Sequence, residues 1–556
     1  MLPALLRRVT MRPENAGTLL SKAALSLCCA IALSFGASRW LSGETGVTGA
    51  APTAASDDAN RCRGCHAYEV DGFARSKMAH SMRAGGQEPA GVVRTPKATI
   101  TIHAGQDGSW QTLESGPSTT SYHVDYVIGS GTHASGYIVD LGDHLFQSPV
   151  AYYRSRGAYD LAPGYERGED PDFTRPVGVG CLFCHAGAFE AVAGTENGYA
   201  RTPFAHLAIG CNRCHGPTGL HLASPQANNI VNPSRLEPAA RDSVCEQCHL
   251  KGVARVLNPG KSFTDFQAGQ PLEDTFTIYH EEAPRGAEGV FRVISHAEQL
   301  AVSECKRNSG ERMWCGTCHD PHNEPTDPIS YYRSKCLQCH AKTAFAATHP
   351  SKTSDCISCH MPRRNAADGG HTAFTDHRIQ RRPANVVAEE AVAIVPWRAP
   401  PANLATRNMG IASIEAGLER RSGKLIVSGY RMLTEVQAQF PQDSELFTTM
   451  GSALLAGRQY GEAVQAFDLA VRFDPTSSPK EANLGVAYAA LGDRALAERH
   501  LQKAMDLDPV NLSAAFQLIS IYNANGDAAK ADQITQRLKS MVQEKTQSNA
   551  PPAGRH

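Results

Sequence analysis

The chain has 556 residues, a length typical of three or four domains rather than one. It carries 54 Lys and Arg against 55 Asp and Glu, so no basic excess points to nucleic acid as a partner. A mean hydropathy of -0.32 excludes a protein with many membrane spans. The unusual counts are 17 Cys and 22 His, which an ordinary intracellular enzyme does not need.

Residues 1–45 have the features of an export signal. Three Arg and one Lys precede a short apolar run over residues 23–37, and this run is shorter than the roughly 20 residues that a membrane-spanning helix requires. A positive segment before a short apolar run is typical of a signal peptide. No clear cleavage site follows, so an uncleaved membrane anchor is the alternative. Residues 46–60, rich in Ala, Thr, Gly and Ser, are expected to form a flexible linker.

Fourteen of the cysteines form seven Cys-x-x-Cys-His motifs. Composition alone predicts roughly 0.02 copies in such a chain, so seven are not accidental. The cysteine pairs are Cys62 and Cys65, Cys181 and Cys184, Cys211 and Cys214, Cys245 and Cys248, Cys315 and Cys318, Cys336 and Cys339, and Cys356 and Cys359. The histidines that follow them are His66, His185, His215, His249, His319, His340 and His360.

This spacing indicates covalently bound haem. Two thiols three positions apart can bond the two vinyl groups of one porphyrin, and the next residue, His, is then the proximal iron ligand. A zinc site made of four thiolates needs such pairs in twos, and neither zinc nor thiol exchange explains the His after each pair. The motifs therefore predict seven haem c groups. Haem c is attached outside the cytoplasm, which agrees with the export signal and predicts a periplasmic or other extracytoplasmic location.

Thirteen histidines from residue 80 to residue 377 lie outside the motifs, enough to give each iron a second axial ligand. His322 follows His319 by three residues, too closely tethered to reach the opposite face of the same haem, so it is expected to serve a neighbouring one. We expect His80 to be another distal ligand, although Met78 and Met82 are rivals for the role. A Met ligand would raise the potential of that haem.

Several strings resemble those of multihaem cytochromes of the cytochrome c-554 type, in the version that carries tetratricopeptide repeats behind the haem domain. The strings are Ile209-Gly-Cys211, Cys214-His215-Gly-Pro, His296-Ala-Glu-Gln-Leu, Cys318-His319-Asp-Pro-His322, Cys359-His360-Met-Pro and Thr375-Asp-His377-Arg-Ile. The resemblance extends over about residues 60 to 540. It implies distal ligation by His221, His296, His322, His349 and His377.

The haem-binding domain is expected over residues 61–380, as short helices and long loops packed on the porphyrins. Before the second motif, apolar and polar residues alternate in two stretches that each read as a hairpin, the second turning at Gly142-Asp143. We therefore expect a β-rich insert over about residues 90–160. Residues 381–403 carry four Pro and no motif, and are expected to form a linker.

The chain beyond the linker repeats every 34 residues. Gly417, Gly451 and Gly485 have this spacing, as do three prolines, which is typical of tetratricopeptide repeats made of paired helices. An all-α solenoid is expected over residues 404–541, with a disordered tail over 542–556.

Three functions are consistent with these features. The first is an exported electron carrier, because iron held by two His has no open position for a substrate. The second is an oxidoreductase that acts on a small nitrogen or sulfur compound at one five-coordinate haem, which we would expect near the β-rich insert. The third is a scaffold in which haem stabilises the fold. Expected partners are redox proteins, and a protein or second copy bound by the repeats.

Overall fold

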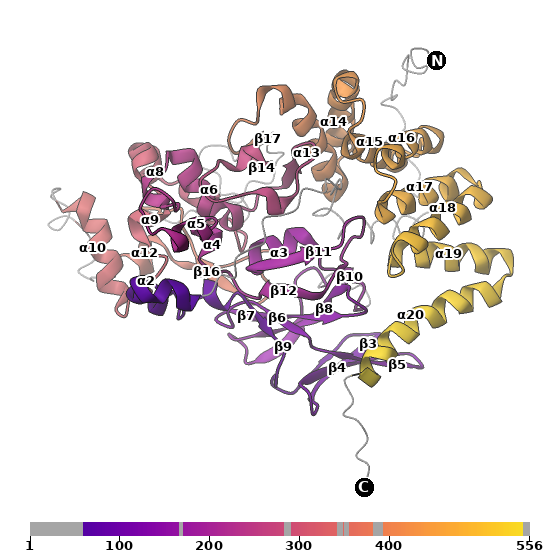
Figure 1. The fold of residues 1–556 in the computed structure, drawn as a ribbon, viewed down its shortest axis with the longest axis horizontal. Helices are drawn as coiled ribbons and strands as arrows, with labels where there is room; N and C mark the ends of the chain where they lie inside the picture. The colour runs from indigo at the N-terminus through magenta and orange to yellow at the C-terminus, as the bar shows by residue number, and fades with distance from the viewer. Residues whose placement is uncertain are drawn as a thin grey trace, which may run out of the picture.

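The structure is a computed structural model, which describes residues 59–165, 171–282, 291–341, 349, 355–381 and 393–548. The predicted export signal lies outside these ranges. Within them, no helix is both long enough and apolar enough to cross a membrane. The chain forms a region of sheets and short helices, followed by an array of paired helices at its C-terminal end (Figure 1).

Two antiparallel sheets follow the first motif. The smaller has the order β2-β3-β4-β5 and contains Gly91–Arg94, Ala98–Ala104, Ser109–Ser115 and Ser118–His123. The larger has the order β1-β6-β7-β8-β10, with β9 paired to β8, and contains Met82–Ala84, Tyr126–Ile128, Ala134–Asp140, Leu145–Tyr153, Ala158–Leu161 and Arg175–Pro176. Both predicted hairpins are confirmed, as β3–β4 and β7–β8. The β-rich region is wider than the predicted 90–160.

Local residues explain the β7–β8 hairpin. Its turn contains Gly142 and Asp143, both with positive φ (63° and 65°), a conformation that Gly and Asp tolerate and that matches the twist of the paired strands. Alternate residues of β3 are buried, and Ile100 and Ile102 pack with Val150 of β8 in one apolar core. The two sheets are therefore held together by a shared core.

The rest of the predicted haem region consists of short helices and long loops, as expected. The helices are α2 (Ala59–Phe73), α3 (Val179–His185), α4 (Asn212–His215), α5 (Gly219–Ala223), α6 (Pro238–His249), α7 (His296–Ala301), α8 (Glu304–Ser309), α9 (Cys315–Cys318), α10 (Pro328–His340) and α12 (Ile357–His360). Short 3-10 turns lie at Met78–His80, Pro233–Arg235, Phe263–Asp265, Leu272–Asp274 and Gly310–Arg312. Two small hairpins pair β11 (Ala188–Ala191) with β12 (Tyr199–His206), and β15 (Arg363–Asn365) with β16 (Ala373–Thr375).

A third sheet joins the two parts of the chain. It has the order β13-β14-β17 and consists of Ala254–Leu257, Phe276–Glu282 and Ala393–Pro396. Strand β17 falls within the predicted linker 381–403, so the described end of that segment is part of the fold rather than an open connection. The reason is a non-local pairing: Val395 lies opposite His280 in the ladder, and Ile394 is buried.

The C-terminal region contains four helical pairs. They are α13 (Ala405–Arg420) with α14 (Gly423–Val436), α15 (Ser444–Ala456) with α16 (Tyr460–Phe473), α17 (Ser478–Leu491) with α18 (Arg494–Leu507), and α19 (Leu512–Asn525) with α20 (Ala528–Ser548). Helix α20 extends beyond residue 541, where the repeats were expected to end, into the predicted disordered tail. The repeated glycines mark the closest approach within a pair, since a Cβ on Gly485 would lie 2.6 Å from Leu501 Cγ.

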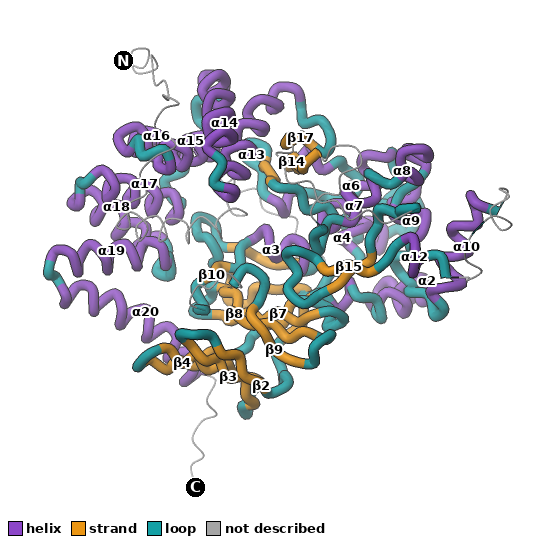
Figure 2. The backbone as a smooth tube through the Cα atoms, turned by 180° about the vertical axis from the view of Figure 1, so that it is seen from behind, coloured by secondary structure: helices purple, strands orange, loops and turns teal. Residues whose placement is uncertain are grey.

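The helical array forms an arc that touches the rest of the molecule at both ends (Figures 1 and 2). At its start, α13 packs on β13, and Val256 and Tyr279 belong to the core of the first repeats. At its end, α20 lies against β5, with Met541 beside the cluster that contains Phe173. Between these points, the Ser478 amide donates to the Gly194 carbonyl at 2.8 Å.

Candidate functional site

Every motif lies on or against a helix, and in six of the seven that helix stops at the motif histidine or one residue before it. Five of these helices end at the motif histidine, α9 ends one residue earlier, and His66 interrupts α2 with φ -121° and ψ 44°. Residues three and four apart share one face of a helix. Both cysteines and the histidine of a motif therefore project to the same side, as attachment to one porphyrin requires.

Five motif histidines lie opposite five of the predicted distal histidines. The ring centres are 6.3 Å apart for His66 and His221, 5.9 Å for His215 and His322, 5.3 Å for His249 and His296, 6.1 Å for His319 and His377, and 6.0 Å for His360 and His349. His322 therefore lies opposite His215 of the third motif.

These separations can be compared with those of two imidazoles on opposite sides of one metal ion. In that arrangement the two ring centres are about 6 Å apart, because each metal–nitrogen bond is about 2 Å long and each nitrogen lies a further short distance from its ring centre. The rings can turn about that axis, so the angle between ring planes, which is 16° for His215 and His322, does not matter for ligation. The separations of four of the pairs fit one iron between the rings, and that of His249 and His296 is shorter.

Hydrogen bonds at Nδ1 orient several of these rings. The acceptors are the backbone oxygens of Val231 for His215 (2.8 Å), Gln380 for His360 (2.9 Å), Thr375 for His377 (3.0 Å), Gln226 for His221 (3.0 Å) and Ser76 for His80 (2.8 Å). A proton held at Nδ1 leaves the Nε2 lone pair available to a metal, and such bonds are usual for ligand histidines. Sequence reasoning missed these acceptors because every residue has a carbonyl.

His296 lies between two of the pairs. Its ring centre is 5.3 Å from that of His249 and 4.9 Å from that of His377. Burial, followed by repulsion from the nearby imidazoles, lowers the pKa of His296 to about 2, and burial lowers that of His319 to about 4. Both rings are neutral near pH 7, the state in which imidazole binds metals. The His296 Nδ1 atom is buried without a hydrogen-bond partner, which is an energetically costly state.

Two predicted site residues, His80 and His185, are not brought into such a pair in the described part of the chain. His80 is exposed, and its neighbour Ser81 donates to the His185 carbonyl at 2.8 Å, which places it near the second motif without contact between the rings. In the described part of the chain, no imidazole ring contacts that of His185. His340 ends α10 immediately before residues that lie outside the described ranges.

The cysteines of different motifs approach one another. The Cys184 thiol lies close enough to that of Cys248 for the two to shift each other's pKa, and the same holds for Cys245 with Cys315. Burial, followed by the nearby Cys356 thiol, raises the pKa of Cys336. The fourteen motif thiols and Cys305 are all free of disulfides. Motifs two and four, four and five, and six and seven are therefore neighbours in space, although only the last two pairs are adjacent in sequence.

Other histidines have polar partners at the nitrogens that a metal would need. His123 contacts Asp125 at Nδ1 (3.0 Å) and Asp107 at Nε2. His144 donates from Nδ1 to the Gly142 carbonyl, and its Nε2 lies 2.9 Å from Asp508 Oδ1. The His371 Nε2 atom lies 2.8 Å from Asp160 Oδ2. These contacts give the three side chains structural roles.

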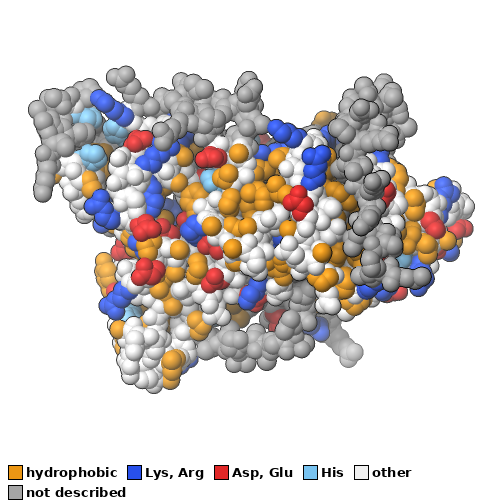
Figure 3. All heavy atoms as spheres, turned by 90° about the horizontal axis from the view of Figure 1, so that it is seen from above, with side chains coloured by type: hydrophobic (Ala, Val, Ile, Leu, Met, Phe, Trp, Pro, Cys, Tyr) orange, Lys and Arg blue, Asp and Glu red, His pale blue; other side chains and the backbone are white. Residues whose placement is uncertain are grey.

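Apolar side chains next to the paired histidines are left uncovered by the polypeptide. Tyr68, near His66, is 71% exposed, and Leu220, before His221, is 66% exposed. Seen from above, histidine side chains reach the surface at the end of the molecule that carries α10, and apolar side chains cover much of the middle (Figure 3). A large flat apolar group would cover such side chains.

Among the described residues, no group of three or more His, Cys, Asp or Glu could hold a free metal ion. The histidine pairs contain two ligands each, the number that iron accepts from protein when a porphyrin supplies the other four. The residues present therefore fit haem, and the donors that would hold it are the motif cysteines and the paired imidazoles.

Comparison with known proteins identifies the repeats. A tetratricopeptide repeat family model matches residues 482–511, which cover most of α17, all of α18 and the loop before α19. No curated protein sequence matches the chain. Similar solved structures include a MamA double mutant of strain RS-1 and MamA from Desulfovibrio magneticus RS-1, each 21% identical to this chain with a TM-score of 0.23. The match to the double mutant covers 27% of this chain and 79% of that one. The match to MamA from Desulfovibrio magneticus covers 26% of this chain and 76% of that one. Kinesin light chain repeats from Podosopora anserina are 20% identical over 26% of this chain and 76% of theirs, with a TM-score of 0.21.

Proposed function

We propose that this protein is an exported multihaem c-type cytochrome that carries electrons through seven covalently bound haems. The observation that supports it best is the placement of five motif histidines opposite five distal candidates, at ring separations of 5.3 to 6.3 Å. Neither zinc binding nor thiol exchange requires such pairs. Haem held by two imidazoles supplies a one-electron centre whose potential depends on its ligands and surroundings.

The chain's own residues would do three things. The motif cysteines would anchor each porphyrin, and the paired imidazoles would occupy both axial positions and so exclude water and substrate. The Nδ1 acceptors, such as the Val231 and Gln380 carbonyls, would hold the rings in place. The close approach of His296 to His377 would bring two of the haem centres near each other, as electron transfer requires.

Intact-mass spectrometry of the mature holoprotein tests this proposal. Seven haems should add about 4.3 kDa to the processed chain, because each motif forms two thioethers with one haem. A fully matured sample with six haems or fewer would contradict the assignment of at least one motif. Apoprotein made without the haem-attachment machinery is the control for the mass of the processed chain.

An oxidoreductase that acts on a small nitrogen or sulfur compound is the second candidate. It needs an iron with an open position, and the observation that favours it is that no described imidazole contacts His185. Carbon monoxide added to the reduced protein separates the two functions. A carrier with seven low-spin haems gives an unchanged spectrum, whereas a five-coordinate haem binds the gas and shifts its absorption.

The tetratricopeptide repeats indicate a protein-interaction module. In the described part of this array there is no Cys, and its one histidine, His500, lies 2.8 Å from Glu481, so the described repeats contain no haem-attachment motif. We therefore propose that it binds a redox partner or a second copy of the chain while the motifs carry the electrons.

A further inference from the structure

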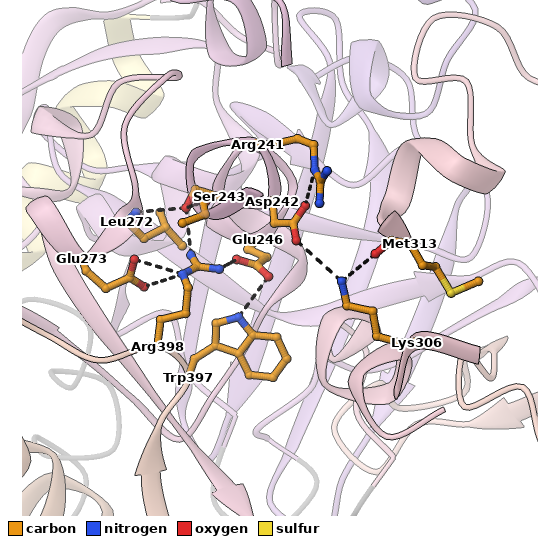
Figure 4. A network of polar contacts seen from close by, with 11 residues as sticks. Arg241, Asp242, Ser243, Glu246, Leu272, Glu273, Lys306, Met313, Trp397 and Arg398 are labelled. Atoms are coloured by element: carbon orange, nitrogen blue, oxygen red, sulfur yellow. Dashed lines mark hydrogen bonds and ion pairs between the residues drawn. The ribbon is translucent and has the colours of Figure 1, made fainter. Parts of the chain in front are cut away.

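One motif contains a buried carboxylate between its cysteines. Glu246 follows Cys245 on α6 and is 6% exposed. It receives hydrogen bonds from two side chains just beyond β17, from Arg398 Nη1 and from Trp397 Nε1 at 3.0 Å (Figure 4). Both partners belong to the segment that leads into the first repeat, so the fourth motif is tied directly to the base of the helical array.

Arg398 joins this motif to a second buried carboxylate. Its Nε atom lies 3.2 and 3.1 Å from the two carboxylate oxygens of Glu273, and its Nη2 donates to Ser243 Oγ at 2.8 Å. Glu273 is 7% exposed and Ser243 is fully buried. One guanidinium therefore faces two carboxylates in a region with little water to screen them, where charges act strongly on each other.

The contacts continue into the first repeat. The Glu273 backbone oxygen accepts from Asn258 Nδ2 at 2.8 Å, and Asn258 Oδ1 accepts from Asn408 Nδ2 at 3.2 Å. Asn408 is fully buried in α13 and also accepts from Arg407. One helical turn before Glu246 on α6, Asp242 contacts Lys306, which donates to the Met313 carbonyl at 2.6 Å, next to the fifth motif.

We propose that Arg398 is a positioning residue that sets the charge beside the fourth haem motif and thereby the reduction potential of the haem at His249. This inference rests on the proposed function. A buried negative charge close to an iron favours its ferric form and lowers its potential, and Arg398 offsets that charge at Glu246. Because Arg398 lies on the path into α13, movement of the repeats would alter the same charge balance.

Potentiometric titration of the holoprotein, followed by visible spectra, tests the proposal. Arg398→Gln should move the midpoint of one haem to lower potential, whereas Glu246→Gln should move it to higher potential. The double variant should return close to the wild-type value, because the two charges cancel. The matched control is Arg472→Gln, because the side chain of Arg472 on α16 is 62% exposed. This variant should leave the midpoint potentials of all haems unchanged.

A merely structural role for Arg398 predicts a different pattern. Loss of packing would move the midpoints of both single variants in the same direction, and this result, or unchanged midpoints, would overturn the inference. If Arg398→Gln does not accumulate with its haems, Arg398→Lys should retain the wild-type midpoint and Glu273→Gln should raise it. Intact mass of the same samples separates the two proposals: too few haems in the wild type contradicts the cytochrome, and seven haems with unmoved midpoints contradict only the role of Arg398.

Discussion

The ligand histidines proposed here differ from the other histidines of the chain in what their two ring nitrogens contact. In His215, His360 and His377, Nδ1 is hydrogen-bonded to a backbone oxygen, and the ring lies opposite another imidazole. His123 and His144 have acidic or backbone partners at both nitrogens. The surrounding fold, and not the number of histidines, therefore decides which of them are available to a metal.

His322→Ala tests the pairing of distal and motif histidines. The variant should keep its haem content, because no cysteine is touched, but one haem should change from low spin to high spin as it loses an axial ligand. Visible and electron paramagnetic resonance spectra would report the change. His371→Ala is the control, since that ring is exposed and bound to Asp160, and it should leave the spectra unchanged. An unaltered low-spin count in His322→Ala would refute the pairing with His215.

At the scale of elements, the 34-residue period reflects close packing within each helical pair. Gly451 and Gly485 are required because a Cβ there would lie 2.7 Å from a Phe467 ring carbon or 2.6 Å from Leu501 Cγ. Phe467 and Leu501 are both fully buried and cannot move aside without disturbing their neighbours. The glycines visible in the sequence are thus the contact points of successive pairs.

Gly485→Ala should lower the free energy of unfolding by about 1–3 kcal/mol, because the added methyl group overpacks the α17–α18 contact. Gly461→Ala is a matched control in α16, where a Cβ would meet nothing within 4 Å. That change should be neutral or stabilising by about 0.5–1 kcal/mol, since Ala loses less backbone freedom than Gly. Denaturant unfolding followed by circular dichroism measures both. A Gly485→Ala protein as stable as the control would contradict the packing argument.

Elements with local signals could be predicted, and those that depend on distant partners could not. The β7–β8 hairpin is encoded by alternation and by Gly142-Asp143, and the repeats by their glycine period. Strand β17 was missed because it forms only against β14, more than 100 residues earlier. The same holds at the candidate site. The motifs and five distal candidates could be read from the sequence, whereas the pairing of each ring and the contact of Arg398 with Glu246 arise only in the fold.

At the scale of the whole molecule, a buried ion pair links the β-rich region to the repeats. His144, immediately before β8, contacts Asp508 in the loop before α19, and both side chains are nearly inaccessible to solvent. Burial opposes the charged imidazole, but the Asp508 carboxylate, 2.9 Å from Nε2, outweighs it, so the pKa of His144 is raised above its usual value. Asp140 acts in the same direction.

Because the folded pKa of His144 is raised, the pair should stabilise the protein fully below about pH 6.5, the ordinary histidine pKa, and progressively less as the pH rises through the folded value. The difference in unfolding free energy between wild type and His144→Gln should therefore be largest at acidic pH, on the order of 1–3 kcal/mol. Thermal unfolding from pH 5 to 8 measures it. His103→Gln, an exposed histidine on β3, is the control. A difference that grows toward alkaline pH would contradict the assignment.

The attachment of the helical array at both ends has a consequence for how it unfolds. Open arrays of repeats lose structure from their termini, since each end repeat has a neighbour on one side only. Here α13 is covered by the β13–β14–β17 sheet and the end of α20 lies against β5, so neither end is free to fray. The repeats should therefore exchange their amide hydrogens as one cooperative unit with the rest of the fold, instead of in a gradient along the array.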